Sequence, residues 1–184
     1  MFKPRYLALF CALATAPLMA AEGTALLRQP DLSANHLAFV YGGDIWLADK
    51  DGKNPRQLTS HPASEFAPHF SPDGKWIVFV RGGDYGAFDE TIPRNPSSSP
   101  ATPKVQVMSL PFEGGQPIVL DEGTEPVIDP SGRFVIYEKN GSVWESPVDG
   151  SSKPIRKFFT KGSVSQYSYE PGGKRILFVA NRRT

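Results

Sequence analysis

The side chains of this sequence that could bind a metal ion are two histidines close to a glutamate. Glu65 stands between His61 and His69. A metal site needs three or four converging ligands, and the one cysteine, Cys11, lies in an apolar N-terminal stretch. Positions in a turn and in an inner strand account for the two histidines. We therefore predict no metal site and no cofactor.

No serine of the sequence stands in the Gly-x-Ser-x-Gly pattern. In serine hydrolases that pattern forms a strained turn that exposes the hydroxyl to a histidine base. The nearest strings, at 150–152 and 162–165, lack the second glycine. Asp51 and Asp73 stand in turns, where short carboxylates accept hydrogen bonds from neighbouring backbone amides. We therefore assign no catalytic residue within this sequence.

These side chains belong to a sequence that repeats. A turn string precedes an apolar run four times, and the first copy is degenerate: 31–35 before 36–40, 71–75 before 76–80, 129–133 before 134–137, and 170–174 before 175–179. The matching aromatics Phe39, Phe79, Tyr137 and Phe178 are 40, 58 and 41 residues apart. A strand-like repeat of about 41 residues is typical of β-propeller blades. The longer step predicts an insertion, which we place at 82–103.

Two of the repeats share one hairpin register. An aromatic residue precedes a tryptophan by seven residues at Phe39 and Trp46, and again at Tyr137 and Trp144. The segments expected to form the innermost strands, around a central channel, are 66–70, 125–128 and 165–169. The bulky residues are expected to pack between blades, because a single blade cannot cover its own apolar faces.

The sequence therefore predicts an all-β protein, a partial β-propeller of four-stranded antiparallel blades after a signal peptide. We place the signal peptide at 1–21 and the propeller at 22–184. Blades are expected near 27–63, 64–124 with the insertion, 125–163, and in part at 164–184, which makes about three and a half. Propellers close with about four to eight blades, so we expect a piece of a longer protein.

The N-terminal 21 residues have the pattern of a secretory signal peptide. Lys3 and Arg5 precede an apolar stretch from Tyr6 to Ala14, and the stretch 18–21 ends in the small residues Ala20 and Ala21. The apolar run is too short to cross a bilayer of ~30 Å, so no stable membrane span is expected. A chain exported without disulfides suits the periplasm, or secretion from a bacterium. With 20 Lys and Arg against 19 Asp and Glu and no basic stripe, nucleic-acid binding has no electrostatic support.

The residue pattern of the repeats resembles that of a known group of propellers. Residues 70–79, which read FSPDGKWIVF, and the strings DIW at 44–46 and RQLT at 56–59 resemble the WD-like repeats of TolB and of tricorn-type proteases. Similar repeats occur in the N-terminal propellers of the prolyl oligopeptidase and dipeptidyl peptidase IV family. The resemblance covers the chain from about Leu27 onward. The proline-rich insertion after Arg81 and the strings that follow it favour the peptidase branch.

The peptidase resemblance implies a propeller that gates and orients peptide substrate for a C-terminal α/β-hydrolase domain absent from this chain. Dipeptidyl peptidase IV relatives hold the amino terminus of the substrate with two glutamates of the propeller. Asp89 and Glu90 are similar in chemistry, because two adjacent anions can pair with an ammonium group. We expect them to be substrate-binding residues. The alternatives are a TolB-like periplasmic propeller that binds a protein partner and the N-terminal part of a tricorn-type protease.

Overall fold

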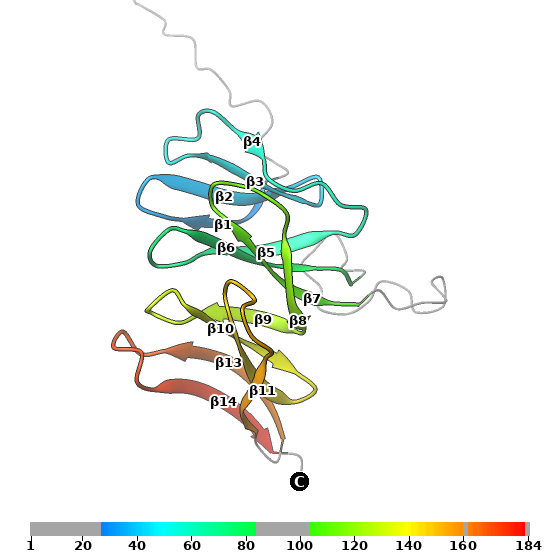
Figure 1. Ribbon diagram of the computed structural model, residues 1–184, viewed down its shortest axis with the longest axis vertical. Coiled ribbons are helices and arrows are strands. Elements are labelled where there is room, and N and C mark those ends of the chain that lie inside the picture. Colours follow the sequence, from blue (N-terminus) through cyan, green and yellow to red (C-terminus); the bar gives the residue numbers. More distant parts are fainter. Residues whose placement is uncertain (1–26, 84–103, 160–161, 183–184) are drawn as a thin grey trace, which may run out of the picture.

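The computed structural model describes residues 27–83, 104–159 and 162–182, and these residues form strands and turns without a helix. Three antiparallel sheets of four strands and one of two strands stack as the blades of a partial propeller (Figure 1). The predicted all-β fold is confirmed. The predicted signal peptide at 1–21 lies outside the described residues, as do Asp89 and Glu90 of the insertion. No membrane-spanning helix occurs in the described part of the chain.

The strands of each sheet follow one another in chain order, so each sheet is a meander. The first sheet contains β1 (Arg28–Leu32), β2 (His36–Tyr41), β3 (Asp44–Asp49) and β4 (Arg56–Gln57). The second contains β5 (Glu65–Phe70), β6 (Trp76–Arg81), β7 (Gln106–Pro111) and β8 (Ile118–Glu122). The third contains β9 (Thr124–Ile128), β10 (Phe134–Lys139), β11 (Ser142–Pro147) and β12 (Ile155–Phe159). The fourth contains β13 (Gly162–Tyr169) and β14 (Ile176–Arg182).

The hairpin register follows the predicted spacing. Phe39 lies opposite Trp46 in the first sheet, and Tyr137 lies opposite Trp144 in the third. In both sheets a two-residue turn links the two strands, and both turn residues have positive φ. Such turns match the right-handed twist of the flanking strands, which is why Gly-Gly and Asn-Gly occupy them.

Three hydrophobic cores lie between neighbouring sheets. The core between the first and second sheets contains Val40, Ile45, Phe79, Met108 and Leu110. The core between the second and third contains Val78, Val107, Leu120, Val135, Tyr137 and Val148. The core between the third and fourth contains Ile136, Val143, Val164 and Tyr167. Successive residues of β6 and of β10 enter different cores, because side chains alternate between the two faces of a strand. As predicted, the bulky residues hold the blades together.

The first strand of each sheet carries a β-bulge at an equivalent position. The residues at the bulges have positive φ although none is glycine: Gln29, Ala67, Glu125 and Gln166, with φ between 49° and 52°. A bulge bends the strand and frees backbone groups from the ladder. Side chains of β1 bond two backbone amides of β5, the first of them at the bulge: the Ala67 amide donates to Gln29 Oε1 (2.7 Å), and the Phe70 amide donates to Asp31 Oδ2 (2.7 Å). The first strands of these two sheets are therefore linked directly.

Candidate functional site

The insertion leaves the second sheet from a tightly packed root. Arg81, the last residue of β6, pairs with Gln106, the first residue of β7. Gly82 follows with φ +92°, and its amide donates to the Ser64 carbonyl (2.9 Å). A Cβ at Gly82 would lie 1.9 Å from the carbonyl oxygen of Lys104. Only glycine fits where the two stems of the insertion meet.

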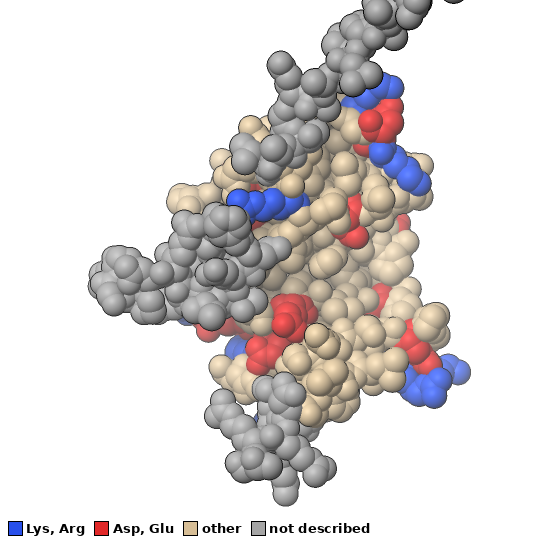
Figure 2. Space-filling view, turned by 180° about the vertical axis from the view of Figure 1, so that it is seen from behind, with Lys and Arg blue, Asp and Glu red and all other residues tan. Residues whose placement is uncertain are grey.

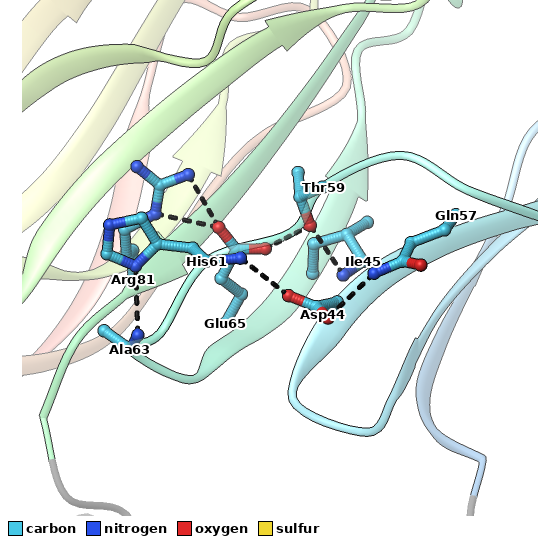
Figure 3. Close-up of polar contacts among 8 residues, drawn as sticks. All are labelled: Asp44, Ile45, Gln57, Thr59, His61, Ala63, Glu65 and Arg81. Carbon is cyan, nitrogen blue, oxygen red and sulfur yellow. Dashed lines mark hydrogen bonds and ion pairs between the residues drawn. The ribbon is translucent and has the colours of Figure 1, made fainter.

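A buried ion pair fixes the first stem of the insertion. The side chain of Glu65 is fully buried, and its Oε1 accepts from Nη2 (2.7 Å) and Nε (2.8 Å) of Arg81. Its Oε2 accepts from the Thr59 hydroxyl, which in turn accepts from the Ile45 amide (2.9 Å). Figure 3 shows this series of contacts crossing from the first sheet to the second. Every group in it is paired, as buried charges require.

An exposed ion pair lies at the second stem, and a more buried one lies on the strand beside it. Lys104 Nζ lies 2.5 Å from Glu122 Oε1, and this contact raises the pKa of Lys104. The carboxylate of Asp121 accepts from Lys139 Nζ (2.6 Å) and from the Tyr137 hydroxyl (2.9 Å). Burial works against ionisation of Asp121, but these hydrogen bonds outweigh it and lower its pKa. The carboxylate therefore stays charged and links the second sheet to the third.

The sheet ends around the root form an acidic rim, which we define as Glu122, Glu125 and Glu138. The three residues lie at the same ends of β8, β9 and β10 that adjoin the root, because Glu122 pairs with Gln106 and Glu138 with Thr124. Among the described residues, Glu125 and Glu138 form no ion pair. The rim could therefore accept a cationic group from a ligand.

The negative charges of the acidic rim affect the pKa of Tyr167. Its hydroxyl donates to the Glu125 carbonyl oxygen (2.5 Å). Burial raises the pKa of Tyr167, and the negative charges of Glu125 and Glu138 raise it further. The face seen in Figure 2 has clustered acidic side chains and isolated basic ones, without a continuous basic patch over its described part. Sequence reasoning missed Glu125 and Glu138. The sequence offered one signal for Glu125: it precedes a proline, as do the bulge residues Gln29 and Ala67.

The two histidines lie apart and have separate local contacts. His61 accepts from the Ala63 amide at Nδ1 (3.0 Å), and its own amide donates to Asp44 Oδ1 (3.1 Å) (Figure 3). His69 Nδ1 lies 4.0 Å from Asp31 Oδ2. Within the described ranges, no three His, Cys, Asp or Glu side chains gather as metal ligands. The structure thus gives His61 a turn position and His69 a strand position.

The turn aspartates accept local backbone hydrogen bonds, as the sequence predicts. Asp51 accepts from the Lys53 amide (3.1 Å), and Asp73 accepts from the Lys75 amide (3.2 Å). These carboxylates stabilise the tight hairpin turns.

Comparison with known proteins relates the chain to two groups of propellers. Residues 24–90 match the tricorn protease N-terminal β-propeller domain. Tricorn protease homolog 2 of Streptomyces coelicolor is 42% identical over 55 residues, covering 29% of this chain and 5% of that protein. The Tol-Pal system protein TolB of Desulfosudis oleivorans is 26% identical over 121 residues, covering 56% of this chain and 28% of that protein.

Solved structures show the same architecture. A TolB structure from Agrobacterium tumefaciens superposes with a TM-score of 0.60 at 18% identity, covering 85% of this chain and 55% of that chain. At this identity the likeness concerns the fold. The chain spans less than a third of the two relatives named above. It is a partial β-propeller similar to the N-terminal propeller of tricorn proteases and to the propeller of TolB.

Proposed function

We propose that this chain is the non-catalytic propeller part of an exported peptidase, in which it gates and orients peptide substrate. The observation that carries the proposal is the root of the insertion, clamped by Glu65 and Arg81 beside the acidic rim. A segment anchored in this way starts from a fixed place next to Glu125 and Glu138, which form no ion pair among the described residues. A peptide presents an ammonium group at its amino terminus, which carboxylates of the rim and the pair Asp89 and Glu90 would attract.

In its narrower form, the proposal assigns the parent protein to the prolyl oligopeptidase and dipeptidyl peptidase IV family. An α/β-hydrolase domain C-terminal to these residues would then supply the serine nucleophile. The match of 24–90 to a protease propeller supports the peptidase role in its tricorn-type form. Both forms give this chain the same task, to admit a peptide and hold its amino terminus. Removal of 1–21 as a signal peptide would place the protein in the periplasm or outside the cell.

The test measures binding to this chain of two fluorescent peptides of the same sequence. One has a free amino terminus, and the other is acetylated there. We expect the free peptide to bind more tightly, and the double variant Asp89→Ala, Glu90→Ala to abolish the difference. The control is Glu113→Ala, which removes an exposed carboxylate from the opposite end of β7. Equal binding of both peptides, or an equal loss in the control, would refute the role of the pair.

The second candidate is a TolB-like propeller that binds a folded protein partner and takes no part in proteolysis. The superposition on TolB over most of the chain favours it. On this reading neither peptide binds, and binding requires a folded partner. The free and acetylated peptides therefore separate the two candidates in one experiment.

A further inference from the structure

The fourth sheet has two strands, whereas each of the other three has four. Its strands β13 and β14 lie at one end of the stack in Figure 1. Within the described residues, no strand pairs with the edge of β14 that faces away from β13, although the equivalent strands β2, β6 and β10 each pair with a third strand there. The backbone N–H and C=O groups along an unpaired edge can bond an added strand. The described part of the fourth sheet is therefore open on one side.

The side chains of β14 indicate that one face of this strand is also uncovered. Leu177 and Val179 flank the repeated aromatic residue of β14, as Val78 and Val80 flank that of β6. Val78 and Val80 are almost fully buried, and Val78 packs in the core against the third sheet. In contrast, Leu177 is 65% exposed and Val179 is 45% exposed. These two apolar side chains therefore occupy positions that are buried in the second sheet.

A third strand beside β14 would complete a side-chain pair that the other sheets contain. In each of them the repeated aromatic residue lies opposite a large apolar residue of the third strand: Phe39 opposite Trp46, Phe79 opposite Met108, and Tyr137 opposite Trp144. Phe178 is the equivalent residue of β14, and its ring lies 4.9 Å from the Phe158 ring of β12, centre to centre. Cross-strand pairs of this kind stabilise a sheet. The open edge is therefore suited to a strand with tryptophan or methionine opposite Phe178.

The outer part of the third sheet is uncovered on the side of the fourth sheet. Ile155, the first residue of β12, lies opposite Glu145 and so shares its face. Val143, two residues before Glu145 on β11, lies on the same face and packs in the core against the fourth sheet. Ile155 is nevertheless 59% exposed. This exposure is expected where the described fourth sheet has no third and fourth strands to extend over β12.

The other seams show what covers the position of Ile155. In the first sheet the equivalent residue is Arg56, whose guanidinium donates to the Phe112 carbonyl (3.4 Å). In the second sheet it is Ile118, and a Cβ at Gly150 would lie 2.9 Å from Ile118 Cγ2. Phe112 and Gly150 belong to the turns between the third and fourth strands of the next sheet. A hairpin of third and fourth strands therefore covers this position in both seams.

The open edge of β14 and the uncovered part of β12 adjoin each other, since Phe178 and Phe158 are in ring contact. We define the fourth-sheet notch as β14 together with Ile155 and Phe158. We propose that the fourth-sheet notch binds a β-hairpin of a separate polypeptide. The first strand of the hairpin pairs antiparallel with β14 and places a tryptophan or methionine opposite Phe178, and the turn of the hairpin covers Ile155.

A hairpin fits the notch better than a single extended strand. A single strand could pair with β14, but it would leave Ile155 exposed, because turns between third and fourth strands make the equivalent contacts in the other seams. The notch contains neither the acidic rim nor the pair Asp89 and Glu90. The inference therefore does not depend on the proposed role in a peptidase.

The probe is a peptide with the sequence of residues 44–59, DIWLADKDGKNPRQLT, which is a third-and-fourth-strand hairpin of this chain. It is acetylated and amidated at its ends and titrated into the isotope-labelled chain, followed by NMR. We expect the amide resonances of 176–182 to shift and their hydrogen exchange to slow. A peptide with Trp46→Asp should bind at least about tenfold more weakly, because it loses the apolar contact with Phe178. Shifts confined to the first sheet would show exchange with the native hairpin and would overturn the proposal.

Two variants of the chain test the two parts of the notch. Ile155→Asp places a charge under the turn of the hairpin, and Phe178→Ala removes the cross-strand partner. Each should weaken binding of the peptide about tenfold, and the thermal midpoint of Ile155→Asp should stay close to that of the wild type because Ile155 is exposed. The matched control is Val119→Asp, at an exposed position of β8 that lies opposite Met108 and so on the other face of its sheet.

Three results would overturn the proposal. The first is the absence of any shift in β14 on addition of the peptide. The second is an equal loss of binding in Ile155→Asp and Val119→Asp. The third is a dimer of the chain alone in which the resonances of β14 shift with chain concentration, because a second copy would then fill the notch.

Discussion

The buried ion pair between Glu65 and Arg81 should be the most sensitive polar contact of the described structure. The substitution Glu65→Ala removes the carboxylate and leaves the guanidinium of Arg81, only 14% exposed, without its partner. It also removes the acceptor of the Thr59 hydroxyl. The same side chain thus joins two strands of the second sheet and links them to the first.

The size of the expected loss of stability follows from the burial of this ion pair. Removing one partner of a buried pair costs about 3–5 kcal/mol, because the remaining charge stays desolvated. With a urea m-value of about 2 kcal/mol/M, the unfolding midpoint should fall by about 2 M. This loss approaches the whole stability of a marginal domain, about 5–15 kcal/mol. Glu65→Gln keeps one acceptor oxygen but replaces the other with an NH₂ donor that faces Arg81 or Thr59, and it leaves the buried guanidinium without a counter-charge, so its loss should stay close to that of Glu65→Ala.

The assay is urea unfolding followed by tryptophan fluorescence and by circular dichroism. Lys53→Ala is the control, because it removes an ion pair with Asp51 in which both side chains are more than half exposed. Its midpoint should equal that of the wild type. A loss below about 1 kcal/mol for Glu65→Ala would refute the inference that the pair supports the seam between the first two sheets.

Three further outcomes are expected. Gly82→Ala should lower the thermal midpoint and shift the amide resonances around the root, because the new Cβ meets the Lys104 carbonyl; an unchanged spectrum would contradict this. Trimming 83–103 to a short turn should leave the strand signal in circular dichroism intact, since a loop changes closure entropy by only ~0.6 kcal/mol per doubling of its length. The purified chain should neither hydrolyse dipeptide substrates nor become labelled by a fluorophosphonate, and stoichiometric labelling would refute the absence of a nucleophile.

A further expected outcome concerns how the free energy of unfolding falls at acidic pH. Burial opposes ionisation of Asp129, but bonds from Ser131, Phe134 and Arg133 outweigh it and hold its pKa below the ordinary 3.8. The unfolded chain therefore takes up the proton first, so this contribution is present above about pH 4 and is lost as the pH falls through the folded pKa. Asp129→Asn should reduce stability at pH 7 and flatten the loss between pH 5 and about 2, measured by urea midpoints. Parallel curves for variant and wild type would contradict this.

The local patterns of the sequence determined the blades and their hairpin register. The seven-residue steps from Phe39 to Trp46 and from Tyr137 to Trp144 predicted one shared hairpin register, because a two-residue turn with positive φ fixes the register of the strands beside it. The expected packing of bulky residues between blades followed from the repeat, because a single blade cannot cover its own apolar faces. The role of Asp89 and Glu90 stays a prediction, since both lie outside the described residues.

Contacts between blades were decided by the tertiary structure. Nothing local to Glu65 indicated that it would be buried against Arg81 and Thr59, or that Glu125 and Glu138 would lie together beside Tyr167. Turn chemistry and strand period act over a few residues and can be read from the chain. The seams depend on how whole sheets pack, and that packing brings together residues whose spacing in sequence carries no signal.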